Sequence, residues 1–181
     1  MTQNQTPSFV QKGKPFDRDM NYVPDRITAG ADKPEHGPVE GDLWPVEPGR
    51  YRLIAARACP WANRSIIVRR LLGLDPVISM GLTGPTHDER SWTFDLDPGG
   101  RDPVLGIERL QEAYFAREAD YPRGITVPAI VDVPTGQVVT NDFPQITQDL
   151  FFEWRDHHGP DAPNLWPDET STSAGTVMPR G

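Results

Sequence analysis

A regular pattern of apolar and polar stretches begins only at residue 51 of this chain. Residues 51–56 form an apolar run that is typical of a buried strand. Beyond Cys59, apolar residues recur four positions apart, as on one face of a helix: Ile67 with Leu71, and Val68 with Leu72. Gly73 predicts the end of this helix, and residues 77–80 form a second apolar strand. The strand, helix and strand together have the size of a parallel βαβ unit.

A polar stretch, residues 84–101, separates this unit from the rest of the chain. It contains two large aromatic residues, which are costly to leave in water without a partner or a ligand. Asp102 and Pro103 then predict the start of a second helix, because aspartate caps helices and proline suits their first turn. Leu110 and Tyr114, four positions apart, would share the apolar face of that helix.

The last regular part of the pattern is a hairpin followed by a third helix. Residues 125–131 read as a strand interrupted by Pro128, and a turn leads into a second strand at residues 137–140. Asn141 and Asp142 are suited to cap a helix. One side of that helix would carry its apolar residues: Ile146, Leu150, Phe151 and Trp154.

The predicted order β-α-β-α-β-β-α indicates an α/β fold. Two parallel strands and an antiparallel hairpin would make a four-stranded mixed sheet with helices on both faces. We expect an extended N-terminal arm over residues 1–46, a folded domain over residues 47–160, and an irregular C-terminal tail over residues 161–181. The arm is rich in proline, glycine and charge and shows no sustained period.

Composition narrows the possible partners and the compartment. The chain has 26 acidic and 18 basic residues, which argues against nucleic acid and anionic membranes as partners. No apolar window approaches the length of a membrane span, and the polar N-terminus lacks the apolar core of a secretion signal. A single cysteine cannot form an internal disulfide, so we expect a reducing cytoplasm. The four histidines show no ligand spacing, and we expect no metal site.

The single cysteine, Cys59, lies where the first strand passes into the first helix, in the tetrapeptide CPWA. Unpaired backbone N–H groups at a helix start stabilise a thiolate over a thiol. Pro60 suits the first helical position. Because the fourth position is Ala62, no neighbouring thiol can resolve an adduct, and an external thiol would be needed. The alternative is that Cys59 is a small buried apolar residue.

Three motifs together carry a resemblance to a known family. They are CPWA at residues 59–62, SWTF at residues 91–94, and TVP at residues 126–128. Their order and spacing resemble the thioredoxin/glutaredoxin fold and, within it, the glutathionyl-hydroquinone reductases, or Xi-class glutathione transferases. The similarity runs from about residue 16 to residue 167.

The resemblance implies a mechanism and a set of site residues. The cysteine thiolate, here Cys59, would attack the sulfur of a glutathionyl-hydroquinone, and a second glutathione would release the mixed disulfide. Pro128 would be in the cis form, which lets the backbone of Val127 pair with the thiol peptide. The thiol-peptide site implied for this chain consists of Trp92, Arg123, Gly124, Ile125, Thr126, Val127, Asp142 and Phe143.

Two positions depart from the family pattern. Residues 124–127 read GITV where the family has RVTV, with Arg123 one place earlier. Asp142 and Phe143 stand where the family has a Glu-Ser pair that holds the γ-glutamyl group, and phenylalanine has no hydroxyl. Both changes fall on the γ-glutamyl end of glutathione, so we take a different low-molecular-weight thiol, such as mycothiol, as an alternative.

Family members are dimers and carry a helical second domain after the segment that matches NLWP at residues 164–167. We expect this chain to carry the thioredoxin-like half with that C-terminal helical, dimer-forming domain absent. An apolar face near Leu72, Phe151 and Trp154 would then be exposed. Two other functions remain open: a non-catalytic remnant that binds a thiol or a partner protein, and a monothiol glutaredoxin-like deglutathionylase.

Overall fold

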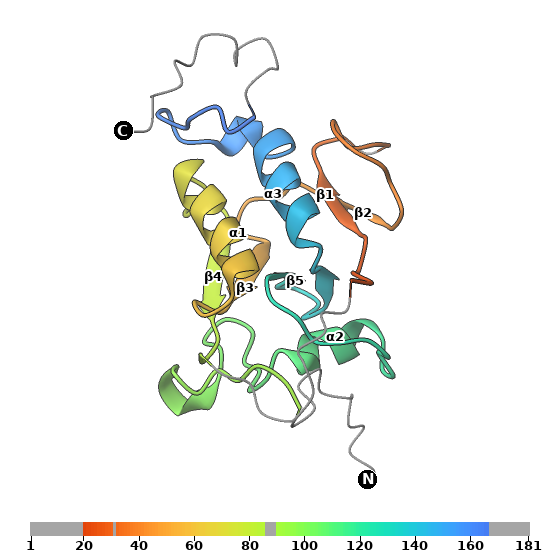
Figure 1. Cartoon of the computed structure of the whole chain (residues 1–181), viewed down its shortest axis with the longest axis vertical. Helices are drawn as coiled ribbons and strands as arrows, with labels where there is room; N and C mark the ends of the chain where they lie inside the picture. Colours follow the sequence, from red (N-terminus) through yellow and green to blue (C-terminus); the bar gives the residue numbers. More distant parts are fainter. Residues whose placement is uncertain (1–19, 31, 86–89, 167–181) are drawn as a thin grey trace, which may run out of the picture.

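Figure 1 shows the computed structural model, which describes residues 20–30, 32–85 and 90–166. Its core is a four-stranded sheet with the strand order β4-β3-β5-β6. The strands are β3 (Tyr51–Ala55), β4 (Ser79–Leu82), β5 (Ala129–Asp132) and β6 (Val138–Thr140). Strand β3 is parallel to β4 and antiparallel to β5, which pairs antiparallel with β6. The predicted mixed sheet and hairpin are confirmed.

Three α-helices cover this sheet. Helices α1 (Pro60–Leu71) and α3 (Phe143–Phe152) pack against each other in front of the sheet, and α2 (Gln111–Arg117) packs beside β6 (Figure 1). Every residue of β3 and β5 is buried. Because side chains alternate between the two faces of a strand, this burial shows that both faces of the sheet are covered.

Several boundaries differ from the sequence prediction. Strand β5 begins at Ala129 and not at residue 125, because Pro128 has no N–H group to donate to a neighbouring strand. Strand β4 begins at Ser79 instead of Val77, because the amides of Val77 and Ile78 still bond to the carbonyl of Leu74 in the preceding turn. The second helix begins at Gln111, and Asp102 does not cap it.

Asp102 has a different role from the helix cap that its position predicted. Its carboxylate accepts hydrogen bonds from the amides of Val104 and Leu105 at 3.0 and 2.8 Å, which closes a turn. The same carboxylate pairs with the guanidinium of buried Arg52 at 2.8 Å. Asp102 therefore does accept backbone amides, as a capping residue would, but it closes a turn that is bound to β3 and does not begin a helix.

The apolar surface lies at a different place from the one expected. Leu72 and Trp154 are fully buried in the core, so the prediction that they would be exposed is wrong. The exposed apolar residues of α1 are Ile67 and Leu71, which are 55% and 48% exposed. They share one face of the helix, as their spacing predicted, but this face turns away from the sheet.

The N-terminal segment contributes more to the fold than its lack of pattern indicated. Strands β1 (Arg26–Thr28) and β2 (Leu43–Pro45) form a parallel two-stranded sheet beside α3 (Figure 1). Val23 and Ile27 of this segment are buried in the same core as the main sheet. The described residues between 20 and 46 therefore pack as part of the domain, while a domain boundary at residue 46 stays a prediction.

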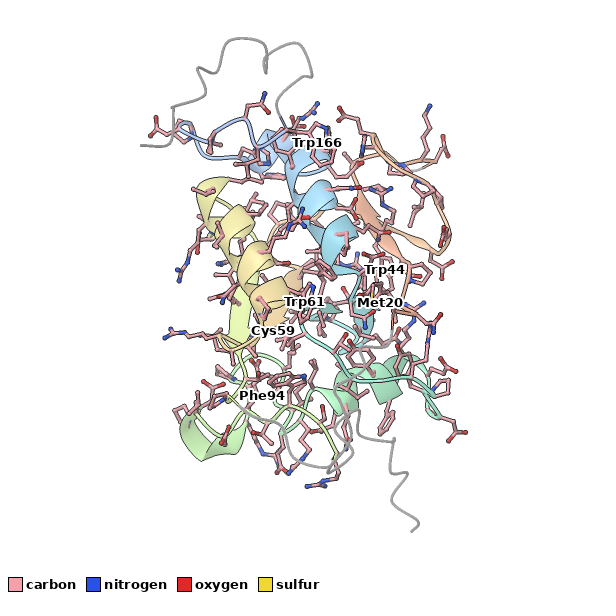
Figure 2. The ribbon with its side chains drawn as sticks, viewed as in Figure 1. Met20, Trp44, Cys59, Trp61, Phe94 and Trp166 are labelled. Carbon is pink, nitrogen blue, oxygen red and sulfur yellow. The ribbon has the colours of Figure 1, made fainter. Side chains whose placement is uncertain are left out.

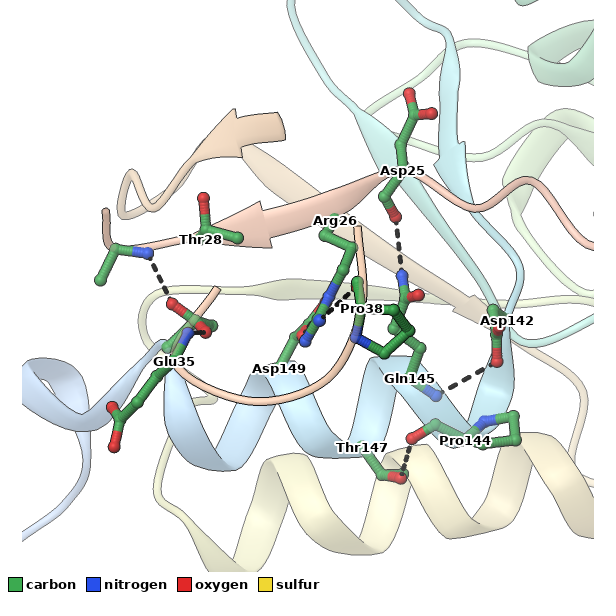
Figure 3. Close-up of polar contacts among 12 residues, drawn as sticks. Asp25, Arg26, Thr28, Glu35, Pro38, Asp142, Pro144, Gln145, Thr147 and Asp149 are labelled. Carbon is green, nitrogen blue, oxygen red and sulfur yellow. Dashed lines mark hydrogen bonds and ion pairs between the residues drawn. The ribbon is translucent and has the colours of Figure 1, made fainter. Parts of the chain in front are cut away.

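Charged groups attach this segment to α3, as Figure 3 shows. The buried guanidinium of Arg26 pairs with the carboxylate of Asp149, and its Nε lies 3.0 Å from Asp149 Oδ1. The amide of Ala29 donates to Glu153 at 2.9 Å, one helical turn further on. The side chain of Gln145 donates to the backbone carbonyl of Asp25 at 2.9 Å. Three successive turns of α3 therefore hold β1 and its flanking residues.

Burial changes the ionisation of Asp149. The loss of surrounding water raises the pKa of Asp149 to about 7, and the hydrogen bond from Arg26 only partly offsets this rise. In the unfolded chain the pKa is 3.8, so the folded protein binds this proton more tightly. The stabilisation from this proton is complete below pH 3.8 and is lost as the pH rises to about 7.

We therefore expect stability to fall with pH through Asp149. Between about pH 5 and pH 8, the free energy of unfolding should fall more for the wild type than for Asp149→Asn, whose side chain cannot ionise. Urea denaturation of both proteins at the two pH values measures this difference. Equal slopes in the two proteins would show that Asp149 does not bind its proton more tightly in the fold.

Candidate active site around Cys59

The fold places Cys59 at the carboxyl end of β3, as the residue that precedes the first turn of α1. Its amide donates to the carbonyl of Ala56 at 3.0 Å, and its own carbonyl accepts the amide of Asn63 at 2.9 Å, which starts the helix. Pro60 occupies the first turn, as predicted. Figure 2 shows Cys59 and Trp61 at the end of α1 that faces the loop carrying Phe94. Cys59 is 8% exposed, so little of the residue is open to a reacting partner.

The thiol lies against the segment that precedes β5. Cys59 Sγ is 3.5 Å from the backbone carbonyl oxygen of Val127, to which it donates, and it makes no capping hydrogen bond to the amides of α1. The Val127–Pro128 peptide bond is cis. Within the described residues, the amide of Val127 has no hydrogen-bond partner. The backbone of Val127 therefore offers a free donor beside the sulfur, as an extended peptide would need for pairing.

A buried hydrogen-bond network supports this segment from behind. The Tyr114 hydroxyl donates to the carbonyl of Thr126 at 2.9 Å, and the Asn141 amide donates to Thr126 Oγ1 at 2.8 Å. The backbone amide of Val23 donates to Asn141 Oδ1 at 2.8 Å. Burial raises the pKa of Tyr114 above its usual value, so the hydroxyl stays a donor. Sequence reasoning assigned Tyr114 to an apolar helix face and Asn141 to a cap, because nothing local signals these long-range contacts.

The two aromatic residues of the polar loop, residues 84–101, differ in burial. Phe94 is fully buried in the core. Trp92 is half-buried, packs against the core, and accepts the amide of Leu110 at its backbone carbonyl at 3.0 Å. A β-bridge between Thr93 and Arg109 fixes the same part of the loop. The loop is thus attached to the start of α2, and contact between Trp92 and a ligand stays a prediction.

The expected γ-glutamyl end of the site is aromatic. Phe143 lies edge-on to Trp61, with ring centroids 6.1 Å apart, and edge-on to Tyr22, with centroids 6.2 Å apart. Asp142 caps α3 by accepting the amide of Gln145 at 3.2 Å, as predicted. Burial raises the pKa of Asp142 above its usual value. We refer to Tyr22, Trp61 and Phe143 as the aromatic cluster.

Arg123 has contacts that the family resemblance did not indicate. Its guanidinium donates to the backbone carbonyls of Asn21 and Tyr22, at 3.2 and 3.1 Å, and lies over the ring of Tyr121 at 5.2 Å. It therefore holds the N-terminal segment next to the aromatic cluster. Its neighbours Gly124 and Ile125 are buried, and their contact with a thiol peptide stays a prediction.

Replacing Asp142 tests whether its side chain stabilises the start of α3. We expect Asp142→Ala to lower the free energy of unfolding by about 1 kcal/mol, because the amide of Gln145 loses its acceptor. Urea denaturation measures this loss. The matched control is Asp142→Ser, whose hydroxyl can still cap the helix and should retain most of the stability. Equal losses in the two variants would count against the capping role.

Neither a metal centre nor a membrane span is found in the part of the chain that the structure describes. Among these residues no group of three or more histidine, cysteine, aspartate or glutamate side chains is arranged to hold a metal ion. None of the described helices is both long and apolar enough to cross a membrane.

The sheet order, the cysteine at the start of α1 and the cis-proline beside it define a domain of the thioredoxin fold, of the kind that opens glutathione transferases. The family model described as glutathione S-transferase, N-terminal domain, matches residues 58–150, about half of the chain. The chain belongs to this family.

Several characterised proteins are similar to the chain. A glutathionyl-hydroquinone reductase of Escherichia coli (strain K12) is 36% identical over 112 residues, which cover 61% of this chain and 34% of the relative. Its glutathione-bound structure has a TM-score of 0.65 at 30% identity and covers 78% of this chain and 46% of that one.

Two further solved structures are similar. A glutathione transferase from Gordonia bronchialis is 64% identical, with a TM-score of 0.73, and the match covers 81% of this chain and 43% of that one. The Xi glutathione S-transferase of Phanerochaete chrysosporium is 26% identical, with a TM-score of 0.71, covering 87% and 51%. The chain therefore spans between a third and about half of the length of these relatives.

Proposed function

We propose that this chain carries the thiol-reactive domain of an enzyme that reduces thiol-conjugated hydroquinones through a mixed disulfide on Cys59. The observation that carries this proposal is the position of the Cys59 sulfur, 3.5 Å from the Val127 carbonyl and beside the cis peptide bond to Pro128. This arrangement suits a thiol compound whose backbone pairs with Val127 while its sulfur meets Cys59. The reductase relatives indicate the type of reaction.

The reaction balances with two thiols as reductants. The Cys59 thiolate attacks the sulfur of the conjugate, the bond between that sulfur and the aromatic carbon breaks, and the carbon takes a proton to give the free hydroquinone. The thiol part of the conjugate stays on Cys59 as a mixed disulfide. A second molecule of the same thiol attacks this disulfide, releases the thiolate of Cys59, and leaves as the oxidised thiol. A reducing compartment such as the cytoplasm would supply that thiol.

Which low-molecular-weight thiol Cys59 reacts with is the second part of the proposal. The relatives named above support glutathione. In this chain, however, Phe143 belongs to the aromatic cluster and Asp142 is occupied as a helix cap, while Arg123 holds the N-terminal segment. A γ-glutamyl group, with its charged amine and carboxylate, finds few free polar partners among these residues. We therefore propose a thiol without that group, such as mycothiol, as an alternative to glutathione.

Intact-mass analysis after exposure to oxidised glutathione, or to the disulfide of mycothiol, tests the first half of the reaction. We expect one adduct on the chain, formed faster with the preferred thiol. Turnover of a hydroquinone conjugate of the same thiol tests the second half. If neither disulfide forms an adduct, the enzymatic proposal fails. An adduct without turnover would favour the thiol-binding alternative, and turnover of glutathionylated proteins in place of hydroquinone conjugates would favour a deglutathionylase.

A further inference from the structure

The segment that presents Val127 to the thiol has no regular secondary structure of its own. Helix α2 ends at Arg117 and β5 begins at Ala129, so Thr126 and Val127 lie in an irregular connection. The backbone carbonyl of Val127 accepts the Cys59 thiol, and its amide is free within the described residues. Hydrogen bonds to the neighbouring residue, Thr126, therefore add to the packing of the buried Val127 side chain in fixing this peptide.

Thr126 is held by contacts from two directions. From α2, the Tyr114 hydroxyl donates to its backbone carbonyl at 2.9 Å, in a fully buried position. From the start of α3, the Asn141 amide donates to its hydroxyl at 2.8 Å, and Asn141 is only 1% exposed. A buried polar group that loses its hydrogen-bond partner is destabilised, so neither contact is easily given up.

Asn141 also connects this segment to the N-terminal part of the chain. The amide of Val23 can only donate, so it fixes Oδ1 of Asn141 as its acceptor, 2.8 Å away. The Nδ2 group is then left to donate to Thr126. The Thr140 hydroxyl donates to the carbonyl of the same Val23 at 2.8 Å, but its hydrogen bonds do not extend to Thr126. Asn141 therefore bridges the N-terminal segment and Thr126.

We propose that Asn141 and Tyr114 are positioning residues, which hold the Thr126–Val127 peptide in place for an incoming thiol compound. Through Asn141, the residues around Val23 become part of this support. The inference rests on the proposed function, in which the Val127 backbone pairs with the thiol compound. It predicts that loss of either residue slows reactions that need this pairing and spares reactions that need only the sulfur.

Two kinds of reagent distinguish reactions that need pairing with the Val127 backbone from reactions that need only the sulfur. Mixed-disulfide formation with glutathione disulfide or mycothiol disulfide needs both Cys59 and the Val127 backbone. Alkylation by iodoacetamide needs only the sulfur of Cys59. We expect Asn141→Ala and Tyr114→Phe to slow mixed-disulfide formation about tenfold, through weaker binding of the disulfide, with iodoacetamide alkylation unchanged. Thr28→Val is the matched control, because its buried hydroxyl donates to the carbonyl of Gly30 at 2.7 Å and to no residue of this network, and both rates should stay at the wild-type value. Equal slowing with both reagents, or slowing by Thr28→Val, would overturn the proposal.

Hydrogen exchange gives a second readout that does not depend on the reaction. Exchange over residues 121–131 should be faster in Asn141→Ala and Tyr114→Phe than in the wild type, and unchanged in Thr28→Val. If Asn141→Ala fails to fold, the nearly isosteric Tyr114→Phe carries the test. If the wild type forms no adduct with either disulfide, the proposed function fails by itself. The positioning role is then judged from exchange alone, and unchanged exchange would refute it.

Discussion

Replacing Cys59 with serine is expected to lower the turnover of a thiol-conjugated hydroquinone by about 10³-fold or more, because a serine hydroxyl cannot form the mixed disulfide. The fold should tolerate this change. Cys59 is 8% exposed, and its sulfur makes one hydrogen bond, to the carbonyl of Val127. A serine hydroxyl can donate to the same carbonyl, so the free energy of unfolding should change by less than about 1 kcal/mol.

Steady-state turnover and urea denaturation of the wild type and Cys59→Ser, side by side, measure the two expectations. The matched control is Arg70→Ala, an exposed position at the far end of the same helix, which should retain wild-type turnover. Turnover by Cys59→Ser within tenfold of the wild-type rate would mean that the chemistry does not pass through the thiol. Loss of turnover together with unfolding would instead assign Cys59 to the core, as a small buried apolar residue.

The sheet could be predicted because its signals are local. Each strand of the main sheet is a short apolar run, and the cap of α3 and the glycine after α1 lie next to the elements that they delimit. The start of α2 was missed because Asp102 and Pro103 also suit a turn, and a turn is what Asp102 forms with β3 behind it. Local sequence cannot distinguish these two uses of a capping residue.

The N-terminal segment could not be predicted from its pattern, because both its polar and its apolar contacts are with residues far away in the sequence. Arg26 and Asp149 are 123 residues apart, and Ala29 and Glu153 are 124 apart. In the site, the motifs at Cys59 and at Val127 and Pro128 were visible in the sequence. The residues that contact Thr126 were not, since Tyr114 and Asn141 lie 12 and 15 residues from it and no local pattern marks their hydrogen bonds.

Removing the carboxylate of Asp149 is expected to destabilise the fold by about 3–5 kcal/mol, because it leaves a charged guanidinium buried without its anion. Arg26 is 1% exposed and cannot lose its proton, so the charge persists in Asp149→Ala. Arg26→Ala should cost less below about pH 7. The pKa of Asp149 is already raised to about 7 by burial, and the unpaired carboxyl can take up a proton.

Removing both charged groups together distinguishes two contributions to the free energy of unfolding. One is the destabilisation by an unpaired buried charge, and the other is the stabilisation by the ion pair itself. In the double variant Arg26→Met with Asp149→Leu, no charge is left unpaired, and we expect most of the stability lost in Asp149→Ala to return. Urea denaturation measures all four proteins at about pH 8, where Asp149 is ionised in the wild type, and measures Arg26→Ala and Asp149→Ala again at about pH 6. A double variant as unstable as Asp149→Ala would mean that the attachment of β1 to α3 depends on the pair itself. Recovery would mean that packing of Val23 and Ile27 in the core is enough to hold the segment against α3 without the ion pair.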